Sequence, residues 1–195
     1  MKRVILTVIL IILPVLCLGE TLTTPASGYL HSPTGILFPK DLGGFQLAGV
    51  TNYEETNPGY GIGLRYSNER AKIDVYLYTL RYSSIPSGAQ SLSVKAEFKA
   101  AVNAISELEK RGSYLNLEII VPEETVLIGK HGFLHARFTH FQEGFLNTSH
   151  LYLTGYKNYL LKIRITSLLG GEENEKMVAD FLKAFSNLLE NIPSN

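Results

Sequence analysis

Hydrophobic residues alternate with polar or small ones in several short stretches, and this period of two predicts β-strands. The stretches cover residues 45–53, 60–66, 73–78, 115–121, 132–141, 149–156 and 159–167. Short turn-forming segments separate neighbouring stretches, so the pattern predicts two antiparallel meanders. Residues 126–128 form a further apolar piece whose type the pattern leaves open.

Two other stretches have apolar residues at spacings of three and four, which predicts amphipathic helices. The first apolar stripe consists of Val94, Phe98, Val102, Ile105 and Leu108. The second consists of Val178, Phe181, Phe185, Leu188 and Leu189, and it follows the acidic residues Glu172, Glu173 and Glu175. Ser91 or Ser93 can cap the first helix, and Gly112 can end it.

The order of elements is three strands, a helix, about four strands and a helix. It predicts an α+β domain in which an antiparallel sheet of about six to seven strands is covered by two main helices, as an α/β/α sandwich. Aromatic residues at polar-face positions, such as Tyr76, Tyr78, Tyr152 and Tyr156, indicate that the second face is also partly covered. We assign this single domain to residues 36–192.

The amino-terminus has the order of a secretory signal peptide. Met1-Lys2-Arg3 precedes an apolar run from Val4 to Leu18, and Gly19 supplies a small residue for cleavage. We therefore expect residues 1–19 to be a leader and the protein to be exported, either periplasmic or secreted. Lipidation of Cys17, or retention of the leader, would instead anchor it to a membrane. Residues 20–35 are rich in Thr, Pro, Ser and Gly, which predicts a flexible tether.

Composition excludes several kinds of partner and chemistry. The net charge of the 195-residue chain is zero and charged residues make up 18% of it, so bulk electrostatics favour neither nucleic acid nor an anionic membrane as a partner. The only cysteine is Cys17. A chain cleaved after Gly19 would therefore contain no disulfide, thiol nucleophile or thiolate ligand.

Motifs for catalysis or cofactor binding are not recognisable. The Gly59-x-Gly61-x-Gly63 pattern lies within a predicted strand and is followed by another strand, whereas a nucleotide loop needs a helix after its glycines. Gly-x-Ser-x-Gly is not present. Histidines 131, 135, 140 and 150 have the composition of a zinc site, but an arginine lies among them and no zinc-ligand spacing is found. We expect no cofactor, no metal and no catalytic residue that the sequence can name.

One surface is a candidate for anion binding. If the apolar faces of 132–141 and 149–156 are kept together, His135, Arg137, His150 and Tyr152 share the opposite face. We expect Lys162 and Arg164 to join this surface and to form a patch for a carboxylate or phosphate. The alternative is a solvated strand whose charges prevent sheet-to-sheet aggregation.

Four segments resemble exported proteins with a PsbP/Mog-like fold. They are Phe38-Pro39-Lys40-Asp41-Leu42-Gly43-Gly44-Phe45, Pro58-Gly59-Tyr60-Gly61-Ile62-Gly63, Asp74-Val75-Tyr76-Leu77-Tyr78 and Tyr152-Leu153-Thr154-Gly155-Tyr156. This fold occurs in photosystem II extrinsic proteins, Ran-binding proteins and uncharacterised bacterial exported proteins. The resemblance implies an antiparallel sheet between helices and a binding or accessory role. It assigns no site residue.

The sequence therefore favours a non-enzymatic exported protein that binds another envelope protein or a small ligand. An enzyme with a site near His135, Arg137, His150 and Tyr152 is one alternative, and a lipid-anchored accessory subunit is another. An enzyme needs a concave pocket with titratable groups of perturbed pKa, whereas a binding module is expected to present a flat apolar or aromatic patch.

Overall fold

The computed structural model describes residues 20–22, 27–168 and 171–191. The predicted leader and Cys17 lie outside the described residues. Among the helices of the described ranges, none is long and apolar enough to cross a membrane.

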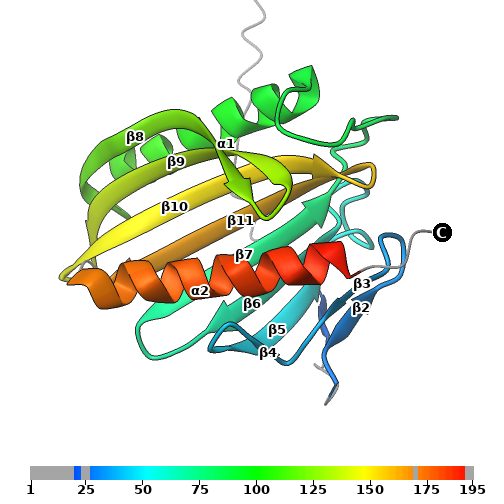
Figure 1. Cartoon of the computed structure of the whole chain (residues 1–195). Coiled ribbons are helices and arrows are strands. Elements are labelled where there is room, and N and C mark those ends of the chain that lie inside the picture. Colours follow the sequence, from blue (N-terminus) through cyan, green and yellow to red (C-terminus); the bar gives the residue numbers. More distant parts are fainter. Residues whose placement is uncertain (1–19, 23–26, 169–170, 192–195) are drawn as a thin grey trace, which may run out of the picture.

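A nine-stranded antiparallel sheet forms the centre of the molecule (Figure 1). Its main path is, in spatial order, β1 (Glu20–Leu22), β5 (Phe45–Asn52), β6 (Ile62–Ser67), β7 (Ala71–Tyr78), β11 (Tyr159–Leu168), β10 (Phe145–Tyr156), β9 (His131–Gln142) and β8 (Leu115–Ile128). The short β4 (Asp41–Leu42) also pairs with β5. Pairing of β7 with β11 joins the two predicted meanders into one sheet.

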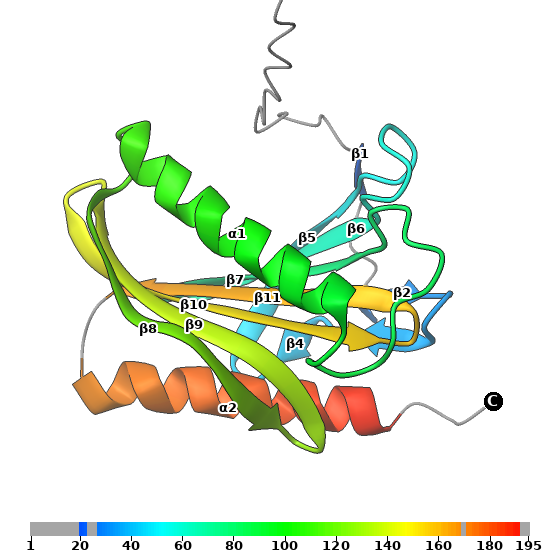
Figure 2. The same ribbon diagram turned by 90° about the horizontal axis from the view of Figure 1, so that it is seen from above.

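The two helices cover opposite faces of this sheet (Figure 2). Helix α1 (Leu92–Lys110) lies against β8, β9 and β10, and helix α2 (Gly171–Glu190) lies against β3 (Ile36–Phe38), β4, β8 and β11. The Ser91 side chain caps α1 by accepting from the backbone N–H of Val94 at 3.3 Å. The α+β architecture expected from the sequence, with the sheet between two helices, is confirmed.

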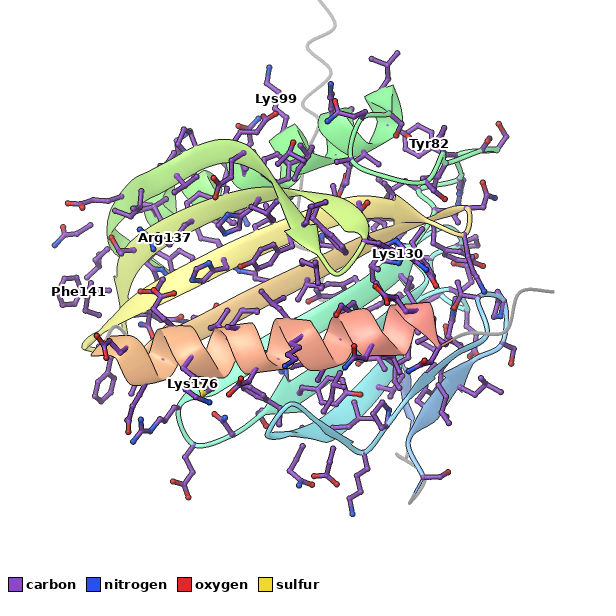
Figure 3. All side chains as sticks on the ribbon, viewed as in Figure 1. Tyr82, Lys99, Lys130, Arg137, Phe141 and Lys176 are labelled. Atoms are coloured by element: carbon purple, nitrogen blue, oxygen red, sulfur yellow. The ribbon has the colours of Figure 1, made fainter. Side chains whose placement is uncertain are left out.

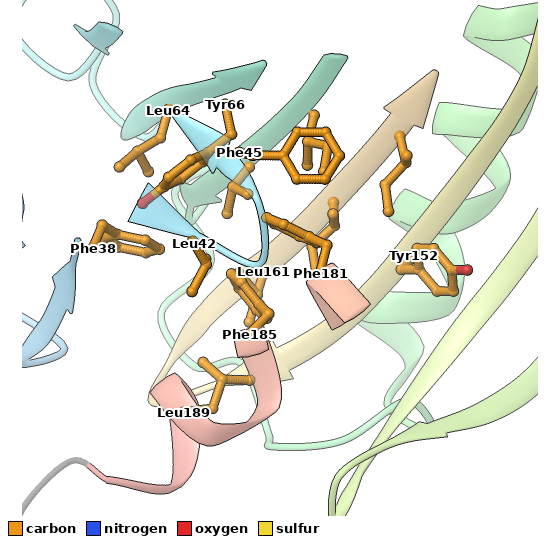
Figure 4. Packing of buried hydrophobic residues seen from close by; sticks show 14 of the residues in the cluster. Phe38, Leu42, Phe45, Leu64, Tyr66, Tyr152, Leu161, Phe181, Phe185 and Leu189 are labelled. Carbon is orange, nitrogen blue, oxygen red and sulfur yellow. The ribbon is translucent and has the colours of Figure 1, made fainter. Parts of the chain in front are cut away.

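Two hydrophobic clusters, one on each face, fill the space between the helices and the sheet. On the α2 side, Phe181 packs edge-on against Phe45 and Tyr66, and Phe185 lies beside it. These rings point from α2 toward the strands (Figure 4). On the α1 side, Val94, Phe98 and Ile105 are buried against the other face. Burial of each large side chain contributes about 1.5–3 kcal/mol to stability.

The amino-terminal part differs from the expected flexible tether. Residues Tyr29–His31 form β2, which pairs with β3 (Ile36–Phe38), and Thr34 in the connecting turn is 2% exposed. His31 Nδ1 lies 2.8 Å from Thr34 Oγ1, so a side-chain hydrogen bond closes the turn. Glu20–Leu22 also pairs with β5. The expectation of a tether is wrong for these segments. It rested on their polar composition, which does not show that they pair as β-strands.

The sheet also has more strands than the six to seven expected. Besides the short β1 and β4, strand β8 continues through Pro122 to include residues 126–128. An edge strand tolerates proline, because its backbone N–H on the outer side needs no ladder partner. The register of β8 on β9 shifts on both sides of this proline, between Ile119 and Val121 and between Val121 and Glu124.

Candidate functional site

The structure brings His135, Arg137, His150 and Tyr152 together on the α2 face of the sheet. His150 is the cross-strand partner of Arg137, and Tyr152 is the partner of His135. Because side chains directly opposite one another in an antiparallel pair share a face, the four groups form one block. We call this block, with Glu124, the histidine cluster.

Three side chains of the histidine cluster form a hydrogen-bonded chain. The Oε1 atom of Glu124 lies 2.8 Å from Nδ1 of His135, and Nε2 of His135 lies 3.1 Å from Nδ1 of His150. The Tyr152 hydroxyl makes a longer contact of 3.4 Å with the same nitrogen of His150. The three rings are nearly parallel, with interplanar angles of 2–15°. Glu124 thus reaches His150 through His135.

Burial keeps the rings of His135, His150 and Tyr152 uncharged. It lowers the pKa of His150 to about 4, assisted by the nearby His135 and Arg137, and it raises the pKa of Tyr152. Burial also lowers the pKa of His135, although the hydrogen bond with Glu124 opposes this. Both imidazoles are therefore neutral at pH 7.

The neutral chain fixes which nitrogen atoms carry hydrogen. A carboxylate only accepts, so Nδ1 of His135 donates to Glu124 and Nε2 of His135 is left as an acceptor. Nδ1 of His150 then donates to that nitrogen. The Nε2 atom of His150 therefore keeps a free lone pair.

A pocket of about 210 Å³ adjoins His150, between the sheet and the start of α2. Its lining includes Thr148 and Ser167, which, like His150, are at most 8% exposed. The hydroxyls of Thr148 and Ser167 and the Nε2 atom of His150 make no hydrogen bond to another described residue. We call this cavity the histidine pocket. Three polar residues of low exposure therefore line one cavity, and their side chains keep unused hydrogen-bonding capacity.

Charged residues lie toward the outside of this site. Arg137 Nη1 is 3.8 Å from Glu175 Oε1, and their side chains are 36% and 63% exposed. Arg137 projects at the end of the sheet that also carries Phe141 (Figure 3). An ion pair so exposed to solvent contributes little to stability. It brings one cation and one anion to the rim of the site.

Lys162 and Arg164 do not belong to this site, so the expected patch of six residues is wrong in its geometry. Lys162 pairs with Leu153, and Arg164 pairs with Leu151, which places both on the α1 face. Their neighbours Leu161, Ile163 and Ile165 occupy the α2 face. The prediction assumed one apolar face, whereas both faces of β11 are covered.

Lys162 instead helps to hold α1 on the sheet. Its Nζ atom lies 3.7 Å from Glu97 of α1 and about 5 Å from the ring centres of Tyr76 and Tyr78. The Tyr78 hydroxyl donates to Glu97 at 2.6 Å. Burial lowers the pKa of Lys162, and Glu97 opposes that shift.

Arg164 has a similar structural role at the other end of α1. It donates to the hydroxyl of Tyr114 at 2.6 Å and lies over that ring, 5.6 Å from its centre. His140 stacks on Tyr114, with 3.8 Å between ring centres. His140 therefore lies on the opposite face of the sheet from His135 and His150.

Sequence reasoning missed Glu124, Thr148 and Ser167. Glu124 lies beyond the predicted strand 115–121, in the part of β8 that follows Pro122. Thr148 precedes His150 by two positions, and Ser167 follows Ile165 by two, so extending the period of two by one step would have put both on the α2 face. Within the described ranges, no group of three or more His, Cys, Asp or Glu has the geometry of a metal site.

Comparisons with known proteins concern the fold. No protein-family model and no curated protein matches the sequence. Among solved structures, cyanobacterial PsbP (CyanoP) from Synechocystis sp. PCC 6803 is 12% identical, with a TM-score of 0.43, and the match covers 84% of this chain and 88% of that one. The Ran-binding protein Mog1p of Saccharomyces cerevisiae is 15% identical, with a TM-score of 0.37, over 80% and 85% of the two chains.

A protein from Bacteroides thetaiotaomicron VPI-5482 is 18% identical, with a TM-score of 0.37. That match covers 63% of this chain and only 37% of the other. Likeness at these identities and TM-scores carries nothing about activity. The chain is thus similar to proteins of the PsbP/Mog-like fold, which is the resemblance that its sequence motifs indicate.

Proposed function

We propose that this protein is an exported, non-enzymatic binding or accessory protein that holds a small polar ligand in the histidine pocket. The observation that carries the proposal is that Thr148, Ser167 and His150, each with a side-chain atom that has no hydrogen-bond partner among the described residues, line one cavity. Polar side chains that line a cavity bind either water or a polar ligand. An occupant of the pocket would supply all three partners at once.

The hydrogen-bonding pattern favours an occupant that donates. His150 Nε2 offers a lone pair at neutral pH, and the two hydroxyls can donate or accept. Glu175 adds a carboxylate to the lining. The volume of about 210 Å³ is below the range of roughly 300–1,000 Å³ that drug-sized ligands occupy, so the ligand is compact. A small alcohol or amine fits these features better than the anion that six clustered residues would have bound.

A titration with three compact probes tests this proposal. We expect glycerol or ethanolamine to shift the side-chain NMR signals of His150 at pH 7.5, and acetate to shift them less. Replacing His150 by Phe removes the acceptor and is expected to weaken binding about tenfold or more.

The matched control is His140→Phe. His140 is as buried as His150 but lies on the α1 face, so this variant should bind the probes as the unaltered protein does. Stronger binding of acetate than of the donors would contradict the proposed chemistry. Equal binding by His150→Phe would contradict the site itself.

An enzyme remains the second candidate because of one observation. The chain from Glu124 through His135 orients a second imidazole toward a pocket, as carboxylate–imidazole pairs do for a general base. However, a general base works best when its pKa is near the working pH. A pKa of about 4 makes His150 a weak base at neutral pH, so we place binding first.

Export is tested by the intact mass of the protein purified from its own host, with soluble and membrane fractions kept apart. We expect a soluble species that begins at Glu20, because Gly19 provides the small residue that leader cleavage requires. A membrane-bound species that begins at a diacylated Cys17 would show a lipid-anchored accessory subunit instead. A retained leader would show the third possibility, an uncleaved anchor.

A further inference from the structure

A separate groove lies on the α1 face of the sheet, over β5, β6 and β7 and away from the strands that α1 covers. Its volume is about 430 Å³. The side chains and backbone that define it belong to Gly49, Tyr53, Gly63, Arg65, Asp74 and Tyr76. We call it the tyrosine groove. It is twice the size of the histidine pocket and shares no lining residue with it.

Glycines keep the floor of the tyrosine groove open. Gly49 and Gly63 lie on neighbouring strands, and neither needs a positive φ angle. A Cβ atom at Gly49 would meet nothing within 4 Å, so the space above it is empty. A Cβ atom at Gly63 would come within 3.0 Å of the Tyr53 ring and 3.1 Å of the Tyr76 ring. Glycine at 63 therefore allows both rings to lie close to the sheet.

The two tyrosines give the groove apolar walls with polar tips. Tyr76 is held by Lys162, whose Nζ atom lies 5.1 Å from the ring centre. The hydroxyls of Tyr53 and Tyr76 make no hydrogen bond to another residue in the described part of the chain. Rings of this kind pack against C–H groups while their hydroxyls bind polar ones.

A single ion pair supplies the remaining polar groups. Arg65 Nε donates to Asp74 Oδ1 at 2.7 Å, and the Asp74 side chain is only 13% exposed. This contact engages one nitrogen of the guanidinium and one oxygen of the carboxylate. Arg65 therefore keeps N–H groups that donate, Asp74 keeps an oxygen that accepts, and the pair has no net charge.

From these features we infer that the tyrosine groove binds an uncharged carbohydrate of one or two sugar rings. A sugar ring has a face of C–H groups that packs on tyrosine, and a rim of hydroxyls that each donate and accept. The Arg65–Asp74 pair matches such hydroxyls without attracting a charged ligand. This site is independent of the histidine pocket, so either assignment can fail without the other.

The test is an NMR titration of the full chain with maltose, cellobiose and chitobiose, supplied separately at millimolar concentration. At least one disaccharide is expected to shift the backbone amide signals of Gly49, Gly63 and Thr51. The signals of Thr148 and Ser167, which belong to the other site, are expected to stay in place. Adenosine serves as an aromatic comparison.

Two variants establish the place of binding. Gly49→Leu fills the empty space and is expected to abolish the shifts, whereas Gly49→Ala leaves most of it open. Asp74→Asn is expected to weaken binding about tenfold. Its matched control is Asp180→Asn, which alters an ion-paired aspartate on α2 and should change nothing. The inference is overturned if no disaccharide shifts the groove signals, if adenosine binds more tightly, or if Gly49→Leu still binds.

Discussion

The protein is expected to lose a large part of its stability, a third or more, as the pH falls from 6.5 to 4. Burial lowers the pKa values of His31, His140 and His150 to about 4, while the unfolded chain keeps values near 6.5. Between pH 6.5 and pH 4 the unfolded chain binds protons that the folded chain does not. The free energy of unfolding therefore decreases as the pH is lowered. Above pH 6.5 the stabilising effect is fully present.

The size of this effect follows from the pKa difference. A change from 6.5 to about 4 corresponds to about 3 kcal/mol for each histidine. If each of the three histidines contributes half of this value, together they contribute roughly 5 kcal/mol. The total free energy of unfolding of a protein is typically about 5–15 kcal/mol. Urea unfolding at a series of pH values measures it.

A variant shows whether the histidines are responsible. His140→Phe keeps an aromatic ring against Tyr114 but cannot be protonated, so it should remove about a third of the pH dependence. Constant stability between pH 7 and 4.5 would contradict the burial of these rings in neutral form.

Replacing Gly155 by alanine is expected to cost about 3 kcal/mol or more of stability. Gly155 and Gly88 exchange two backbone hydrogen bonds, of 2.8 and 3.1 Å, which fasten the segment before α1 to strand β10. A Cβ atom at Gly155 would lie 2.0 Å from the carbonyl oxygen of Pro86. Because that neighbour is backbone, the segment must move and the bridge must break.

The control for this variant is Gly132→Ala in β9. Gly132 also has an ordinary φ angle, and the nearest atom to its Cβ position is 4.0 Å away. Thermal unfolding of both variants should show a large fall in melting temperature for Gly155→Ala alone. Similar stability of the two would mean that the bridge to Gly88 contributes little.

Alternation and helical spacing predicted the elements well because each strand and helix buries a regular set of positions. The same reasoning correctly placed His135, Arg137, His150 and Tyr152 on one face. It failed for Lys162 and Arg164, because Leu161, Ile163 and Ile165 of β11 face α2, whereas the apolar side chains of β9 and β10 with which they were aligned face α1. Leu160 faces α1, whereas Leu161 faces α2. Alternation along a strand separates its two faces, but it does not show which helix covers each face.

Other differences arise from contacts between distant residues. Nothing in the local sequence shows that Glu124 meets His135, since β8 shifts register around Pro122 before reaching it. The β2–β3 hairpin depends on His31 packing edge-on against Tyr159, far along the chain. The tyrosine groove likewise needs three strands in register before Gly49, Gly63 and Tyr76 define a common surface.

The turn between β10 and β11 has an importance that its exposed position hides. Lys157 and Asn158 both have positive φ angles, 46° and 65°, as a two-residue type I′ hairpin turn requires. This turn pairs Tyr156 with Tyr159 and thereby sets every later pair. A slip of one residue would point Lys162 and Arg164 into the phenylalanines of α2. Surface turns usually tolerate changes of length. Here the two-residue length of the turn decides which side chains of β11 face α1 and which face α2.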